Sequence, residues 1–86
     1  MKAEFKKNSK EFQLFGDFYQ LMKTYYEHED SLEWYDKWMT DLEAFWKKYG
    51  VVKSRKYQQK DKPALLAYIL GFALADFIDN VAYNRL

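Results

Sequence analysis

The longest uninterrupted apolar stretch of the chain lies between residues 64 and 75, where the sequence reads ALLAYILGFALA without a charged or amide side chain. A helix that is apolar on every side has to be covered by other parts of a protein. Asp61 is suited to cap such a helix, and Pro63 to occupy its first turn, where a missing amide hydrogen costs nothing. The pattern therefore predicts a buried helix over residues 62–82, followed by a tail that frays.

The same stretch is too short to cross a bilayer. Its twelve residues compare with the roughly 20 that a membrane span needs, and Asp76 and Asp79 follow it directly. The N-terminal sequence MKAEFKKNSKEF is charged and lacks the apolar region of a signal peptide. We therefore expect a cytoplasmic protein that does not enter a membrane.

An aromatic-rich segment comes first in the chain. Its apolar residues recur at steps of three and four, which places them on one face of a helix over residues 9–26. Asn8 or Ser9 is placed to cap this helix. Gly16 lies within it and weakens it by about 0.5 to 1 kcal/mol relative to alanine.

A second amphipathic segment is the best delimited of the three. The period of three and four residues resumes in it and predicts a helix over residues 31–49, capped by Asp30 or Ser31. Gly50 supplies a left-handed stop. Residues 50–62 have no clear period and are strongly polar, so we expect a connector there with at most one helical turn.

Three helices joined by short connections favour an antiparallel arrangement. The predicted fold is all-α, an up-down-up three-helix bundle in which the third helix is the buried axis, and residues 1–86 form one domain. Ala67, Gly71 and Ala75 make a stripe of small side chains on that helix. Such a stripe lets another helix approach closely, either in the core or, less often, across a dimer contact.

The formal net charge of +1 conceals a separation of charge. Residues 1–11 carry +2 and residues 47–62 carry +6, whereas residues 27–36 carry −5. In the predicted topology the two basic segments lie at the same end. Clustered Lys and Arg bind phosphates, and a tyrosine among them can stack on a base. This predicts, as an alternative function, nucleic-acid binding through Lys6, Lys7, Lys53, Arg55, Lys56, Tyr57 and Lys60. A plainer interpretation is a solvated connector whose lysines keep the protein soluble.

Residues that carry chemistry are scarce. The chain has no cysteine, and His28 is its one histidine, so thiolate sites and histidine pairs are excluded. The acidic residues around His28 lack a known metal-ligand spacing. Asp76 and Asp79 lie one turn apart and could do acid–base work if buried, although carboxylates at the end of a helix more often face solvent. We expect no enzyme activity, cofactor, metal site or small-molecule substrate.

Aromatic residues make up 21% of the chain. One core-facing stripe on each of the first two helices cannot hold all their rings, so some rings should be exposed. Tyrosine and tryptophan are enriched at interface hot spots. The leading hypothesis is an interaction protein that binds a protein partner or a second copy through exposed Tyr19, Tyr26, Trp34 and Trp46. The structural alternative is a thick core edge with tyrosine hydroxyls in water.

Three stretches carry a resemblance to known proteins, namely EFQLFGDFYQLMKTYYE, the second helix ending in KKYG, and ALLAYILGFALADFID. Their order resembles that of short helical proteins of unknown function encoded by phages and integrative elements of low-GC Gram-positive bacteria. The similarity is one of pattern over most of the chain. It implies a cytoplasmic accessory protein of a mobile element, and it brings no active site with it.

Overall fold

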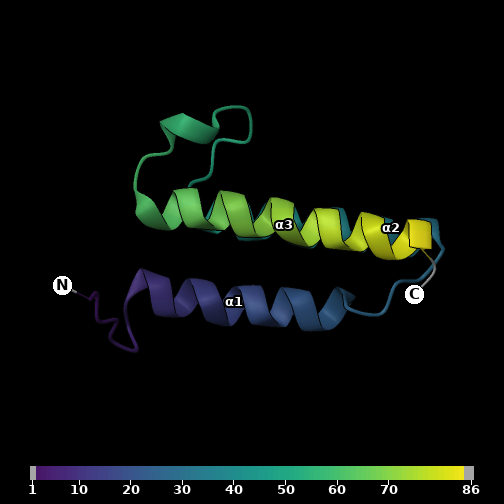
Figure 1. Ribbon diagram of the computed structural model, residues 1–86, viewed down its shortest axis with the longest axis horizontal. Coiled ribbons are helices and arrows are strands. Elements are labelled where there is room, and N and C mark those ends of the chain that lie inside the picture. Colours follow the sequence, from purple (N-terminus) through teal and green to yellow (C-terminus); the bar gives the residue numbers. More distant parts are fainter. Residues whose placement is uncertain (1, 85–86) are drawn as a thin grey trace.

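The structure, a computed structural model, describes residues 2–84, apart from the side chain of Lys56. Three α-helices follow one another, α1 (Lys10–Tyr25), α2 (Leu32–Lys48) and α3 (Lys62–Asn84), and a short 3₁₀ helix, η1 (Lys56–Gln58), precedes α3. Each α-helix packs against the other two. The predicted all-α three-helix bundle is therefore confirmed, with α1 and α3 running in the same direction (Figure 1).

The helix ends follow from their capping residues. Ser9 caps α1 and Ser31 caps α2, each through a side-chain oxygen that accepts a bond from a backbone amide three residues on. Asp61 does the same for Ala64 at 2.9 Å, and Gly50 has a φ of 70° where α2 stops. The predicted bounds agree with these to within two residues.

The largest difference is at the tail, where the pattern predicts fraying after residue 82 and α3 continues to Asn84. Arg85 and Leu86, which belong to the same predicted tail, lie outside the described residues.

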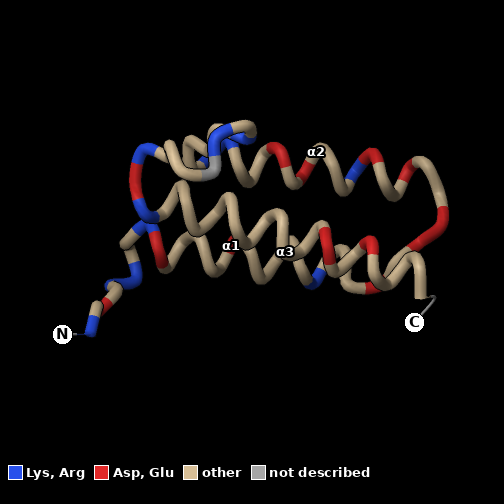
Figure 2. The backbone as a smooth tube through the Cα atoms, turned by 45° about the horizontal axis from the view of Figure 1, so that its top comes forward, with Lys and Arg blue, Asp and Glu red and all other residues tan. Residues whose placement is uncertain are grey.

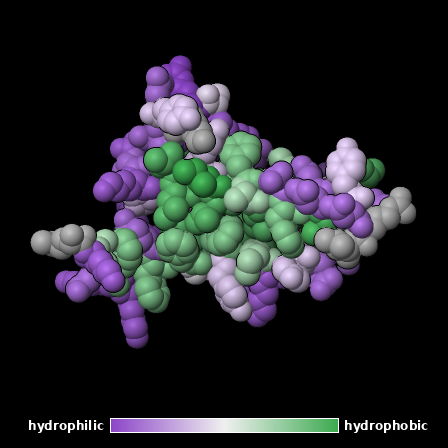
Figure 3. All heavy atoms as spheres, viewed as in Figure 1, coloured by the Kyte–Doolittle hydropathy of each residue, from purple (hydrophilic) through white to green (hydrophobic). Residues whose placement is uncertain are grey.

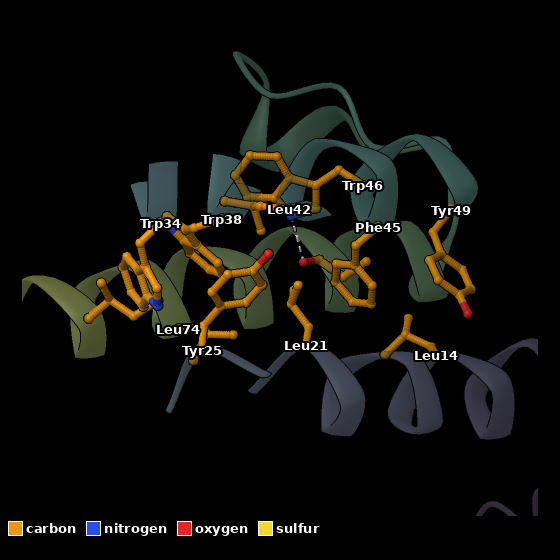
Figure 4. Close-up of a cluster of buried hydrophobic side chains, with 12 residues drawn as sticks. Leu14, Leu21, Tyr25, Trp34, Trp38, Leu42, Phe45, Trp46, Tyr49 and Leu74 are labelled. Carbon is orange, nitrogen blue, oxygen red and sulfur yellow. Dashed lines mark hydrogen bonds between the residues drawn. The ribbon is translucent and has the colours of Figure 1, made fainter. Parts of the chain in front are cut away.

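The core is dominated by side chains of α2 (Figure 4). Steps of three and four residues point one face of that helix at both neighbours, which is why α2 contributes all three tryptophans of the chain to the core. Leu14 and Ile78 are the largest side chains that are fully buried. The cluster consists of Leu14, Leu21, Tyr25, Trp34, Trp38, Leu42, Phe45, Trp46, Tyr49, Ala67, Leu74 and Ile78.

The small side chains of α3 make room for one indole ring. Trp46 of α2 lies so close to Gly71 that a Cβ built there would be 2.2 Å from the indole Nε1. The same nitrogen donates to the backbone oxygen of Ala67 at 2.9 Å, in a buried hydrogen bond. The stripe therefore serves packing within the bundle.

The covering of α3 is incomplete. Although α3 contacts both other helices, its side chains Ile69, Phe72 and Phe77 are 43%, 43% and 38% exposed. The expectation that this helix is buried on every side is wrong. Two neighbouring helices cover only the part of its circumference that faces them, and α3 is apolar beyond that part.

Candidate functional site

The four aromatic residues predicted to bind a partner divide into two pairs. Tyr19 and Tyr26 are 54% and 56% exposed, as predicted. Trp34 and Trp46 are only 8% and 4% exposed, so the expectation that they lie at the surface is wrong. Trp34 packs edge-on against Tyr25, with ring centroids 5.4 Å apart. Their apolar area is large, and the core of so small a bundle takes it up.

Several of the exposed apolar residues of α1 and α3 lie together on one side of the bundle, whereas others, such as Leu32 and Met39, lie on α2. Phe12 and Phe15 are 51% and 48% exposed, and lie on the same side of α1 as Tyr19. We call this surface the aromatic face. It is formed by Phe12, Phe15, Tyr19, Met22 and Tyr26 together with Leu66, Ile69, Ala73 and Phe77.

The two halves of the aromatic face are continuous. Tyr26 and Phe77 stack across the joint between the helices, with ring centroids 5.6 Å apart. A shallow apolar groove of about 190 Å³ lies beside them, lined also by Met22 and Ala73. Figure 3 shows the apolar region that spreads over α3 and onto α1 on this side of the molecule.

The predictions from the sequence do not include the α3 half of this face, although the sequence carries a signal for it. Ala64 to Ala75 is apolar around the whole helix, whereas a helix in a three-helix bundle is covered only on the side of its neighbours. An all-round apolar helix in such a fold predicts an exposed apolar face as directly as it predicts a core.

On the opposite side of α1, two tyrosine–carboxylate pairs join α1 to α2. Tyr25 donates to Asp41, and Tyr49 donates to Asp17, both at 2.5 Å. Burial and these hydrogen bonds raise the pKa of both phenols. The two pairs link α1 to α2. The hydroxyl groups of both tyrosines are therefore already hydrogen-bonded within the fold.

Lys48 completes the second of these pairs through an ion pair of 2.7 Å with Asp17. Burial alone would raise the pKa of Asp17, but the hydrogen bonds from Lys48 and Tyr49 and the charge of Lys48 outweigh it, so the pKa is lowered. Asp17 and Lys48 line a groove of about 300 Å³. The carboxylate of Asp17 in this groove is therefore charged and already paired with Lys48.

The remaining candidates for chemistry are not brought together. His28 Nε2 and the hydroxyl of Tyr35 are 2.5 Å apart, and the histidine ring packs against Trp34. Among residues 2–84, no group of three or more acidic or histidine side chains is placed to hold a metal ion. Asp76 and Asp79 are both exposed, which confirms that they face solvent.

The basic residues lie where the topology predicted. The N-terminal arm with Lys6 and Lys7 and the connector between α2 and α3 are at the same end of the bundle, and most acidic residues lie toward the other end (Figure 2). We call these the basic end and the acidic end. Within the connector, Lys53 bonds to Glu43 at 2.9 Å and Arg55 to Gln58 at 3.0 Å.

The other predicted phosphate-binding residues occupy the same connector. Tyr57 is 88% exposed, and Lys60 is exposed with its side chain over Gly50. Lys56 begins η1, and its side chain lies outside those described. Gln59 links two parts of this segment. Its side-chain oxygen accepts from the backbone N–H of Val52, and its side-chain nitrogen donates to the backbone oxygen of Val52.

One helix of the described chain, Lys62–Asn84, is long and apolar enough to cross a membrane by length and composition, with a mean hydropathy of 1.6 in its most apolar window. Of that window, 28% is buried within the bundle. Core helices of soluble proteins meet the same criterion of length and composition, but they are mostly buried.

Fold and surface together define a small helical bundle with one uncovered aromatic face and a separation of charge along its length. Comparisons with models of protein families, with curated proteins and with solved structures found no match to this chain.

Proposed function

We propose that this chain is a non-enzymatic interaction protein that binds the apolar helical surface of a protein partner through its aromatic face. The observation that supports this function is the area of uncovered apolar surface. Five rings of the face, those of Phe12, Phe15, Tyr19, Tyr26 and Phe77, are between 38% and 56% exposed.

The size of this surface is at the upper end of what single chains expose. With about 200 Å² for a whole aromatic side chain, the exposed parts of the five rings sum to roughly 500 Å². This is near the upper limit of the largest apolar patch on a typical monomer, about 300 to 600 Å², before the aliphatic residues are added. Charged residues also flank these rings at both ends of the bundle. An apolar centre with a charged rim is typical of a specific protein–protein interface.

The function is tested by photo-crosslinking from the face in living cells. A photoreactive phenylalanine derivative is placed at Tyr19, and as a matched control at Met39, which is 47% exposed on α2. We expect a defined adduct from position 19 and none from position 39. The additional substitution Phe15→Glu, on the same stripe, should abolish the adduct because it puts a charge into the interface.

Two results would contradict the proposal. One is the absence of an adduct at position 19 in a chain that is shown by circular dichroism to be folded. The other is an adduct that survives Phe15→Glu, since it would then not depend on the face.

Nucleic-acid binding is the second candidate function, and it is favoured by the position of the arm and the connector at one end (Figure 2). Lys53 is paired with the carboxylate of Glu43, so the charge available for phosphates is smaller than the sequence count. Binding to a labelled duplex and a single strand at two salt concentrations tests it. Affinity should fall steeply with salt, and no binding at low salt would exclude this function.

The role in a mobile element that the sequence resemblance implies stays a prediction. It is compatible with either function, since neither depends on it.

A further inference from the structure

Two exposed rings of α1 lie symmetrically about Tyr19, and two further apolar side chains lie between them and it. Phe12 and Tyr26 lie seven residues before and after it, and Phe15 and Met22 lie four before and three after it. Seven residues are two helical turns, so these positions share one side of the helix. If α1 meets another copy of itself in antiparallel fashion with Tyr19 at the centre, Phe12 faces the partner's Tyr26, and Phe15 faces the partner's Lys23, next to Met22.

The exposed side of α3 has the same property about Ile69. Lys62 and Asp76 lie seven residues before and after it, and both are exposed. In an antiparallel pair centred on Ile69, Lys62 lies opposite the partner's Asp76. This pair matches opposite charges.

The two centres lie at the same height in the bundle. Lys10 of α1 forms an ion pair with Asp61 at 3.8 Å, and Tyr26 stacks on Phe77. Both contacts join residues that are 51 positions apart in the sequence, whereas Tyr19 and Ile69 are 50 apart. A single two-fold axis perpendicular to α1 and α3 can therefore pass close to both Tyr19 and Ile69.

Charge selects this axis over its alternative. Two copies can pack the same face together about a two-fold axis in the plane of the interface. That axis runs either along the helices, which makes the copies parallel, or across the helices, which makes them antiparallel. An axis along the helices places the basic end of one copy on the basic end of the other. An axis across the helices places the basic end against the acidic end (Figure 2), and like charges in contact are strongly disfavoured.

We propose that the aromatic face is covered by a second copy of this chain, packed antiparallel about a two-fold axis that passes by Tyr19 and Ile69. This inference rests on the proposed function, and names the partner. The five rings alone contribute roughly 500 Å² per copy, or about 1,000 Å² in the dimer, which is the lower bound for a specific interface. The aliphatic residues and the charged ends add to this area.

The pairing of Lys62 with Asp76 is tested by charge reversal in sedimentation equilibrium of the purified full chain. We expect a monomer–dimer equilibrium for the natural sequence. Lys62→Glu and Asp76→Lys should each raise the dimer Kd on the order of tenfold, because each change creates two repulsive pairs per dimer. The double variant restores both pairs, and its Kd should return to within about threefold of the natural value.

The position of the axis is tested by single cysteines, since the natural chain contains none. Residues on a two-fold axis meet their own copies, and closely packed helices bring such positions within reach of a disulfide. Tyr19→Cys and Ile69→Cys should form covalent dimers rapidly under mild oxidation, whereas Met39→Cys on α2 should not. Circular dichroism of each variant establishes that it is folded.

Three outcomes would overturn the proposal that a second copy covers the aromatic face about this axis. The first is a natural chain that remains monomeric at all concentrations. The second is a dimer whose Kd ignores the charge reversals and whose cysteines at 19 and 69 react no faster than the one at 39. The third is a monomer that sediments with vesicles of phosphatidylcholine and phosphatidylglycerol, in which case the face covers a lipid surface.

The mass of the adduct from position 19 in cells separates this inference from the proposed function. An adduct of twice the chain mass supports both. An adduct of another mass that Phe15→Glu abolishes leaves the interaction function in place and overturns the second copy as its partner. No adduct contradicts both.

Discussion

Replacing Gly71 with alanine should destabilise the bundle, although alanine is the better helix former. A Cβ at this position would lie 2.2 Å from Nε1 and 2.6 Å from Cε2 of Trp46, which is far inside van der Waals contact. The indole has to move, and its buried hydrogen bond to Ala67 is then stretched or lost. The overlap meets a ring held in the core and not the mobile end of a side chain.

The magnitude follows from three contributions. Overpacking a core costs about 1 to 3 kcal/mol, and a buried donor left without its acceptor costs about 1 to 3 kcal/mol. The higher helix propensity of alanine offsets about 0.5 to 1 kcal/mol. We expect Gly71→Ala to lower the free energy of unfolding by about 1 to 5 kcal/mol, which for a chain of this size lowers Tm by roughly 10 °C or more.

Gly16 provides the matched control. It lies inside α1, and a Cβ built there has no heavy atom within 4 Å outside its own surroundings in the helix. Gly16→Ala should therefore raise the free energy of unfolding by about 0.5 to 1 kcal/mol. The same chemical change thus has opposite signs at the two sites, and the sign depends on the neighbouring side chain alone.

Urea unfolding followed by far-UV circular dichroism measures both variants, at one low protein concentration so that self-association does not differ between them. A double-mutant cycle with Trp46→Phe then isolates the contact, because the smaller ring should make Gly71→Ala much less costly. Equal shifts of the same sign at positions 16 and 71, or a cycle with no coupling, would refute the packing of Trp46 against Gly71.

Three further perturbations test the rest of the fold. Leu14→Ala empties a site that is 0% exposed and should cost about 2 to 5 kcal/mol in urea unfolding, whereas Leu70→Ala, at a partly exposed position, should cost less than about half of that. Ser31→Ala removes the cap of α2 and should cost about 1 kcal/mol, with Ser31→Asp recovering most of it. Because the fold raises the pKa of Tyr25 and Tyr49, its stability should fall as the pH rises above about 10, where the unfolded phenols ionise. The Tyr25→Phe/Tyr49→Phe double variant should lose less stability over that interval.

Each of these has an outcome that contradicts it. Equal costs at positions 14 and 70 would mean that the side chain at position 70 is as central as that at position 14. A Ser31→Ala variant as stable as the natural chain would mean that the cap contributes nothing. If the stability falls equally at alkaline pH with and without the two phenols, their ionisation does not cause the pH dependence.

The helices and their ends follow from local rules that a sequence displays. Capping by Ser9, Ser31 and Asp61 and the stop at Gly50 depend on residues within four positions of one another, so their spacing can be read directly. The separation of charge is also visible in the sequence, since the topology of three helices with short connections leaves few arrangements.

The burial of particular rings does not follow from local rules. Trp34 and Trp46 were expected at the surface with Tyr19 and Tyr26, and the core takes up both tryptophans. Periodicity places a ring on a side of its helix, but which side faces a neighbour depends on the rotation of the helix in the bundle. That rotation is decided by contacts between residues far apart in the chain, such as the fit of Trp46 against Gly71.

The sequence by itself thus determined that α3 is apolar throughout, that two amphipathic helices accompany it, and that opposite charges collect at opposite ends. Only the tertiary structure decided which part of that apolar surface is core and which is left uncovered. The reason is physical, since hydrophobicity has no direction of its own, and two helices cannot enclose a third. The stretch Ala64 to Ala75 therefore supplies one wall of the core with one of its sides and half of the aromatic face with the other.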